Sequence, residues 1–210
     1  ITVCVGAWNI DDRIPTRSSI ASEDMHMAPI GPLLMTAFCI LFIEAGLTYW
    51  MPSLLSDQSG DSTAAAAYMA RFFFWFVIVR LTAAALAVWV STLGFAVFGL
   101  AGICCSLALV LAGIVPLSET SFTGAFMGLI FPNAYAWMLT KGGGGTTTGA
   151  KILLSAITGA TLGPWILGWV LPYWGESAVL WLLGSLSLAT ASLMLISHLN
   201  VGYRAYQPSQ

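Results

Sequence analysis

Hydrophobic residues gather into six long stretches, and short polar gaps separate them. Each stretch is close to the ~20 apolar residues that an α-helix needs to cross a hydrocarbon core of about 30 Å. The pattern therefore predicts an all-α membrane protein with six transmembrane helices. The six stretches are Leu33–Leu55, Ala64–Ala83, Gly94–Val115, Phe122–Thr140, Ala150–Leu171 and Ala178–His198.

The composition supports a chain embedded in lipid. Of the 210 residues, 58% are hydrophobic and 8% are charged, whereas a soluble domain carries about 25% charged residues. The mean hydropathy is +0.86. A net charge of −2 supplies no basic field for nucleic acid. We therefore expect the lipid bilayer as a partner and no nucleic acid.

Charged residues sort by sign between the gaps, which predicts the orientation in the membrane. Gaps one, three and five contain acidic residues and neither Lys nor Arg. Basic residues lie before the first helix, near gaps two and four, and in the tail. Basic residues favour the cytoplasmic side, so both termini are expected there. The acidic set is Asp57, Asp61, Glu119 and Glu176, and the basic set is Arg13, Arg17, Arg80, Lys141, Lys151 and Arg204.

This orientation divides the chain into three parts. Residues 1–28 are expected to form a polar cytoplasmic segment, residues 29–200 the six-helix bundle, and residues 201–210 a cytoplasmic tail. The plasma membrane is the expected location. The second and third helices are expected to be joined by a turn at Ala84–Leu93.

Prolines and glycines inside the helices predict bends and close contacts. Pro132, and Pro164 after Gly163, are expected to kink the fourth and fifth helices, because proline removes a backbone hydrogen bond. Two pairs of glycines recur at four-residue spacing, which lets membrane helices approach closely. Close packing and a moving interface both remain open for these pairs, which are Gly124-xxx-Gly128 and Gly159-xxx-Gly163. Large aromatic residues near the acidic ends fit an interfacial belt, namely Trp50, Trp165, Tyr173 and Trp174.

Glu44 is the first candidate functional residue. It lies in the middle of the first helix, where an ionised carboxylate costs a few kcal/mol or more unless it is paired, hydrated or protonated. Such residues mark substrate or proton sites, or form a structural hydrogen bond to another helix. Thr48 lies one turn further along the same face.

Three other residues could join Glu44 in a site. Arg71 lies about two turns into the second helix, and it either snorkels outward or pairs with Glu44. Trp75 is one turn deeper on the same face, where it either stacks on a sugar ring or only packs. Asn133 follows Pro132, and it either lines a site at a broken helix or makes an interhelical hydrogen bond.

No sequence feature indicates an enzyme or a metal site. No helix carries carboxylates or histidines at metal-ligand spacing, and there is no serine elbow or HExxH motif. We expect no catalytic residue, no metal and no cofactor.

Four segments together resemble the major facilitator superfamily, in the branch of fucose permeases and sodium-dependent glucose transporters. The resemblance spans Pro29 to about Asn200. One departure is Val79, which takes the place of the family's glycine before Arg80. The segments are Glu44-Ala-Gly-Leu-Thr-Tyr-Trp50-Met-Pro-Ser-Leu, similar to the family's seventh helix; Ala66-Ala67-Tyr68-Met69-Ala70 with Phe74-Trp75 and Arg80, similar to the eighth; Phe131-Pro132-Asn133-Ala134, similar to the tenth; and Gly159-Ala-Thr-Leu-Gly163-Pro164, similar to the eleventh.

The resemblance implies the carboxyl-terminal six-helix half of a twelve-helix transporter, whose partner is an amino-terminal six-helix half. Such halves rock about a site near the membrane midplane. The expected ligand is a small polar organic solute such as a sugar, with a proton or sodium as coupling ion. Glu44, Thr48, Arg71, Trp75 and Asn133 would form the binding or proton-coupling site. Gating is expected at the Pro132 and Gly163-Pro164 kinks, and Arg80 marks a cytoplasmic-end motif. The alternative is a non-transporting receptor, assembly subunit or degenerate paralogue, in which the buried polar residues serve packing.

Overall fold

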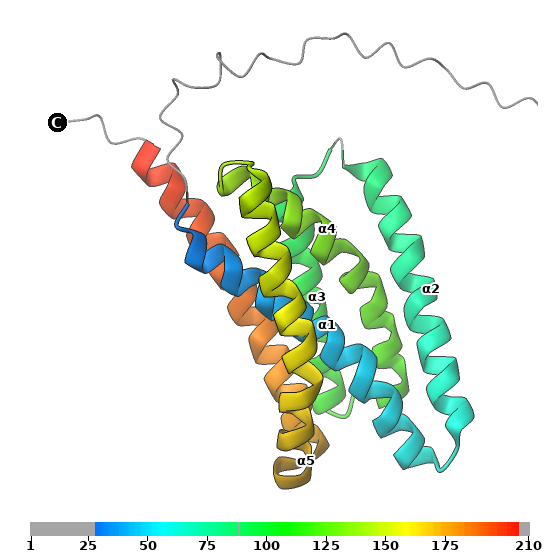
Figure 1. Ribbon diagram of the computed structural model, residues 1–210. Coiled ribbons are helices and arrows are strands. Elements are labelled where there is room, and N and C mark those ends of the chain that lie inside the picture. The colour runs from blue at the N-terminus through cyan, green and yellow to red at the C-terminus, as the bar shows by residue number, and fades with distance from the viewer. Residues whose placement is uncertain (1–27, 88, 206–210) are drawn as a thin grey trace, which may run out of the picture.

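The computed structural model describes residues 28–87 and 89–205, and within them the chain forms helices and no strand (Figure 1). A short 3-10 helix, η1, precedes the fourth α-helix. The elements are α1 Ile30–Ser59, α2 Ser62–Leu86, α3 Thr92–Leu111, η1 Leu117–Phe122, α4 Thr123–Lys141 and α5 Thr146–Ala205.

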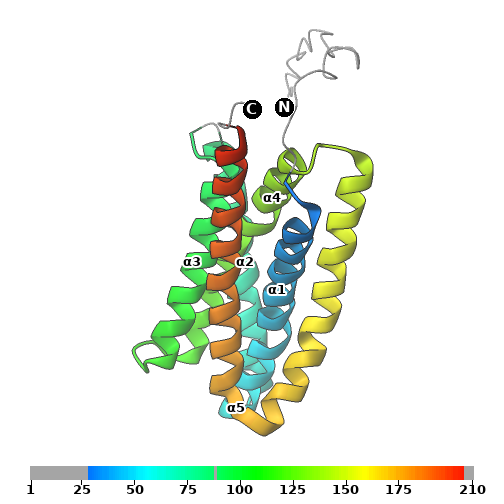
Figure 2. The same cartoon turned by 90° about the vertical axis from the view of Figure 1, so that its left-hand side faces the viewer.

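The longest helix, α5, consists of two arms. Its backbone departs from helical geometry at Gly175, with φ 77° and ψ 178°, a region that only glycine occupies readily. The chain reverses there, so residues 146–174 and 176–205 run side by side in opposite directions (Figure 2). The two expected helices are present, but a bend at Gly175 joins them in place of a loop.

The described helices agree with the six predicted stretches to within about four residues at most ends. The expected turn at Ala84–Leu93 matches the link between α2, which ends at Leu86, and α3, which begins at Thr92. The second arm of α5 continues to Ala205, so the expected tail at 201–210 begins as helix. The expected cytoplasmic segment, apart from Ala28, lies outside the described residues, as do Arg13, Arg17 and residues 206–210.

Four of the described helices are long and apolar enough to cross a membrane: α1, α2, α3 and the part of α5 from Thr146 to Leu199. The chain is thus all-helical, with a helix content and hydropathy compatible with an integral membrane protein. A crossing by each of the six helical segments belongs to the proposal below.

Helix α1 lies at the centre of the bundle. Apolar residues three or four apart along it are fully buried, including Leu33, Ile40, Leu47 and Met51. Gly46 faces both arms of α5, because a Cβ atom built there would lie 2.7 Å from Leu167 and 3.0 Å from Leu183. Figure 2 shows α1 between the two arms. This central position decides where the functional candidates on α1 lie.

The two glycine pairs make the closest helix contacts. On α4, Gly124 and Gly128 face the backbone carbonyls of Phe72 and Phe76 on α2. On the first arm of α5, Gly159 and Gly163 face the carbonyls of Phe38 and Phe42 on α1. A Cβ atom at Gly124 or Gly159 would overlap the facing carbonyl oxygen. The prediction of close packing is confirmed.

The charges separate between the two ends of the bundle. The α1–α2 link, the α3–α4 link and the Gly175 bend lie at one end (Figure 1). These three links contain or adjoin Asp57, Asp61, Glu119 and Glu176. The links after α2 and α4 lie at the opposite end, where Lys141 and Lys151 are found. We call the first end the acidic end.

Candidate functional site

Glu44 lies near the middle of α1, and its side chain is half-buried. It is close enough to the Arg80 guanidinium on α2 for a Coulombic attraction. The described residues contain a single salt bridge, which involves neither residue, so the attraction acts without direct contact. The Arg80 side chain is exposed and that of Glu44 is half-buried, whereas the sequence suggested a pair of Glu44 and Arg71.

Arg71 does not pair with Glu44. Its Nη1 lies 3.7 Å from Oε1 of Glu119, and the two side chains are 60% and 54% exposed. The pairing arises because η1, which contains Glu119, packs beside α2. An exposed pair of this kind contributes about 0–1 kcal/mol. The outward-reaching alternative for Arg71 therefore describes the structure, and the pairing with Glu44 is wrong.

Arg80 lies inside the helix rather than at its end. Helix α2 continues six residues beyond it to Leu86, which is about 9 Å along the axis. The Arg80 guanidinium carbon lies 5.3 Å from the centroid of the Phe76 ring. The sequence predicts the end of this helix at Ala83, and α2 ends three residues later at Leu86; the role of Arg80 in a cytoplasmic-end motif stays a prediction.

Thr48 and Asn133 bond to their own helices. The Thr48 hydroxyl donates to the Glu44 carbonyl at 2.9 Å. Asn133 Nδ2 donates to the Leu129 carbonyl at 2.7 Å. Both side chains are half-buried. The Asn133 bond uses its amide N–H, so the Oδ1 atom of the same amide remains able to accept a hydrogen bond.

The ring of Trp75 packs against the last residue of η1. Its centroid lies 4.9 Å from that of Phe122 in an edge-to-face arrangement, and Phe122 in turn lies 6.0 Å from Phe126. Edge-to-face pairs of this kind add about 0.5–1.5 kcal/mol beyond burial of area. Phe122 is thus a packing partner of Trp75, as the packing alternative predicts.

The predicted kinks leave the helices unbroken. Helix α4 runs through Pro132, and α5 remains helical at Gly163 and Pro164. The Pro164 carbonyl accepts a hydrogen bond of 2.9 Å from the indole N–H of Trp50 on α1. This segment therefore ties α5 to α1, and the change of direction in α5 lies at Gly175.

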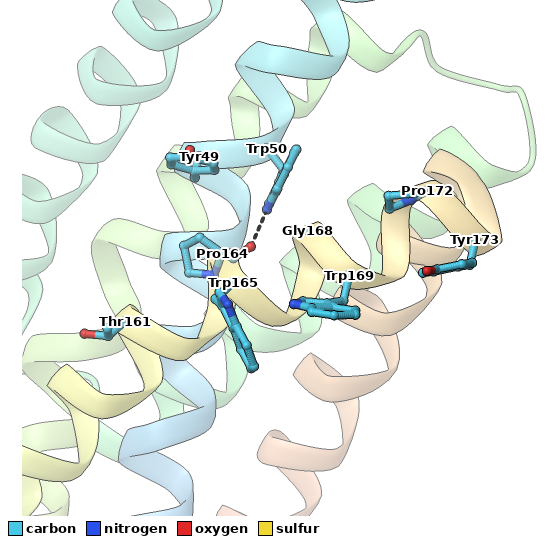
Figure 3. A pocket seen from close by; sticks show the side chains of 9 residues that line it. All are labelled: Tyr49, Trp50, Thr161, Pro164, Trp165, Gly168, Trp169, Pro172 and Tyr173. Atoms are coloured by element: carbon cyan, nitrogen blue, oxygen red, sulfur yellow. Dashed lines mark hydrogen bonds between the residues drawn. The ribbon is translucent and has the colours of Figure 1, made fainter.

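Among the described residues, two of the cavities on the bundle concern the candidate site. The larger, about 590 Å³, lies between α1 and the first arm of α5 (Figure 3), and the smaller, about 310 Å³, lies beside η1. Glu44, Arg71 and Asn133 line neither cavity. The larger is lined by Tyr49, Trp50, Thr161, Pro164, Trp165, Gly168, Trp169, Pro172 and Tyr173; the smaller is lined by Ser106, Leu109, Val110, Val115, Glu119, Thr120 and Phe122.

Sequence reasoning missed the larger cavity, although one signal for it was present. Trp165, Trp169 and Tyr173 recur every four residues, which places them on one helix face. The sequence analysis assigns Trp165 and Tyr173, but not Trp169, to an interfacial belt. The contribution of Tyr49 and Trp50 from α1 required the α1–α5 packing, which no local pattern contains.

No protein-family model, no curated protein and no solved structure matches this chain. The class defined by the structure is an all-helical chain with four helices able to cross a membrane.

Proposed function

We propose that the chain is half of a secondary membrane transporter of the major facilitator type. In this proposal each of the six helical segments crosses the bilayer, with the basic end and both termini on the cytoplasmic side. A second six-helix bundle completes the protein. The solute is a small polar organic molecule, with a sugar as the expected class, and a proton or sodium ion is the candidate for coupling.

The observation that supports this proposal most is the location of Glu44 and Arg80. Both charged groups lie within helices that are long and apolar enough to cross a membrane. Ionisable groups in such segments are costly and mark substrate or ion pathways. A solute or ion that binds Glu44 would change its attraction to Arg80 and favour one arrangement of α1 and α2.

The helix arrangement also supports alternating access. The first arm of α5 packs on α1, and α4 packs on α2, through glycines at carbonyl distance. Contacts without intervening side chains suit small sliding movements between helices. Asn133 and Pro132 on α4 are proposed to supply the second polar wall of the site.

The alternative, a non-transporting membrane protein, also has specific support. Thr48 and Asn133 donate hydrogen bonds within their own helices, and Arg71 pairs with Glu119. In this alternative these polar groups serve packing, and the protein is a receptor, an assembly subunit or a degenerate paralogue.

Solute uptake by the full-length protein in proteoliposomes tests the proposal. A panel of sugars is assayed with and without proton and sodium gradients. We expect uptake to fall about ten-fold or more in Glu44→Gln, since a transported solute or ion loses its charged partner. Asp57→Asn is the matched control, because this carboxylate is exposed near the end of α1 and lies outside the proposed site.

Two results would overturn the proposal. One is an absence of uptake of every solute by correctly folded and oriented protein. The other is uptake that is unchanged in both Glu44→Gln and Glu44→Ala.

A further inference from the structure

Aromatic rings form most of the wall of the cavity between α1 and α5. Trp50 reaches from α1 to α5, while Trp165, Trp169 and Tyr173 follow one another along α5 (Figure 3). The rings of Trp165 and Trp169 are 6.1 Å apart and steeply tilted, at 65°. Several ring faces and edges therefore line a space about the size of one small molecule.

Trp50 is held in place by the helix opposite. Its indole N–H donates to the Pro164 carbonyl, and the far edge of its ring lies over Gly168, where a Cβ atom would be 3.1 Å away. A side chain at position 168 would meet this ring. The indole is thereby ordered before any ligand binds, which lowers the entropic cost of binding.

The cavity is neutral, but it lies close to the acidic end. None of its nine lining side chains is charged. Glu176 follows Tyr173 by three residues, and its carboxylate accepts a hydrogen bond of 2.6 Å from the amide of Gln58 on α1. Asp57 lies about 10 Å along the axis beyond Trp50. A neutral amide leaves the charge of Glu176 uncompensated, so the potential near the cavity is negative.

We propose that this aromatic cavity binds a quaternary ammonium group. Ring faces attract cations through their negative quadrupole, with Trp the strongest, and quaternary ammonium groups are the ligands for which aromatic walls are best suited. Such a cation needs no hydrogen-bond acceptor, which fits a wall without carboxylates, and the acidic end increases its local concentration. The site lies apart from Glu44 and is independent of the solute proposed above.

Two sources present this chemistry: a free organic cation and the choline headgroup of a lipid. The test uses the full-length protein in nanodiscs of phosphatidylglycerol and phosphatidylethanolamine, which contain no choline. Binding of labelled choline is measured by equilibrium dialysis. The neutral probe is 3,3-dimethylbutan-1-ol, in which carbon replaces the charged nitrogen.

We expect choline to bind and the neutral probe to bind at least about ten-fold more weakly. Trp165→Leu and Trp169→Leu should each weaken choline binding about ten-fold, while Trp169→Phe, which keeps a ring, should lose less. Trp181→Leu is the matched control, because Trp181 is equally exposed and lies outside the cavity. Circular dichroism of each variant establishes that it is folded.

Phosphatidylcholine added to the nanodiscs then distinguishes the sources. Competition with free choline identifies the lipid headgroup as the ligand, and undiminished choline binding identifies a free cation. The proposal is overturned if choline does not bind, if the neutral probe binds equally well, or if both leucine variants bind choline as the unsubstituted protein does.

Discussion

Asp61 is the N-cap of α2 and lies two residues after the end of α1 at Ser59. Gly60 closes α1 in a left-handed conformation, with φ 66°, which glycine adopts without strain. The Asp61 carboxylate then accepts hydrogen bonds from the backbone N–H of Thr63, at 2.8 Å, and from its hydroxyl. This N-cap satisfies a donor that the first turn of a helix otherwise leaves free.

The cap should make stability depend on pH. Hydrogen bonds from Thr63 lower the pKa of Asp61 in the folded protein, below the unfolded value of about 3.9. The stabilisation is therefore complete above about pH 3.9 and is lost as the pH falls through the folded pKa. Asp61→Asn keeps the acceptor without titrating. Thermal unfolding of both proteins should show a wild-type advantage that shrinks on acidification, and a constant difference would contradict this account.

Residue partners were the part of the site that the sequence could not predict. Spacing placed Arg71 and Glu44 in buried positions on neighbouring helices, but it contained no information about η1, which brings Glu119 to Arg71. Asn133 was predicted to line a site or to bridge helices, and it instead bonds one turn back to Leu129. Such partners depend on rotamers and on irregular links, which hydropathy does not encode.

At the scale of helices, glycine decides which pairs approach closely. Helices α2 and α4 meet where Gly124 and Gly128 face carbonyl groups, and α1 and α5 meet in the same way at Gly159 and Gly163. A second contact of the α1–α5 pair is the hydrogen bond of 2.8 Å from the Ser155 hydroxyl to the Leu34 carbonyl. Without a hydrophobic driving force in lipid, such close packing supplies much of the association energy.

Substitution by alanine, which adds one methyl group, should therefore lower stability at a glycine in a close helix contact and not at a glycine with free space around it. Gly124→Ala places a Cβ atom against the Phe72 carbonyl, and overpacking of this type costs about 1–3 kcal/mol. Gly184→Ala is the control, because its Cβ atom would lie 3.8 Å from Leu107 and alanine favours helix by about 1 kcal/mol. Thermal unfolding in detergent should show a loss for the first variant only. Equal stability of the two variants would show that α2 and α4 can move apart without cost.

Helix positions were predictable because the apolar stretches are long and their ends are marked by Gly, Pro or polar residues. The glycine spacing also predicted close contacts. The sequence did not show that α5 would continue almost without a gap through Pro172 to Gly175, since Glu176 and the flanking aromatics resemble an ordinary link. The bend at Gly175 takes the place of the loop that the sequence predicted between the two helices.

For the whole molecule, alternation of six helical segments places every acidic link at one end. Helix α1 begins and the second arm of α5 ends at the opposite end, so the chain enters and leaves the bundle on one side (Figure 1). The orientation proposed above assigns that side to the cytoplasm.

Cysteine labelling of the full-length protein tests this orientation. In a variant without native cysteines, Asp57→Cys should react with a membrane-impermeant maleimide in intact cells. Thr147→Cys should react only after permeabilisation. Both positions are exposed, so access to each depends on the membrane and not on burial within the protein. The reverse pattern would place the acidic end inside, and labelling of both from one side would refute the crossing.

The bend at Gly175 has a consequence for biogenesis. Because a single residue separates the two arms of α5, no polar segment between them can emerge from the bilayer ahead of the second arm. Each arm alone would expose its packing face, whereas the pair forms one helical hairpin with its backbone groups satisfied. In the proposed six-crossing topology, the two arms would therefore enter the bilayer together as one unit.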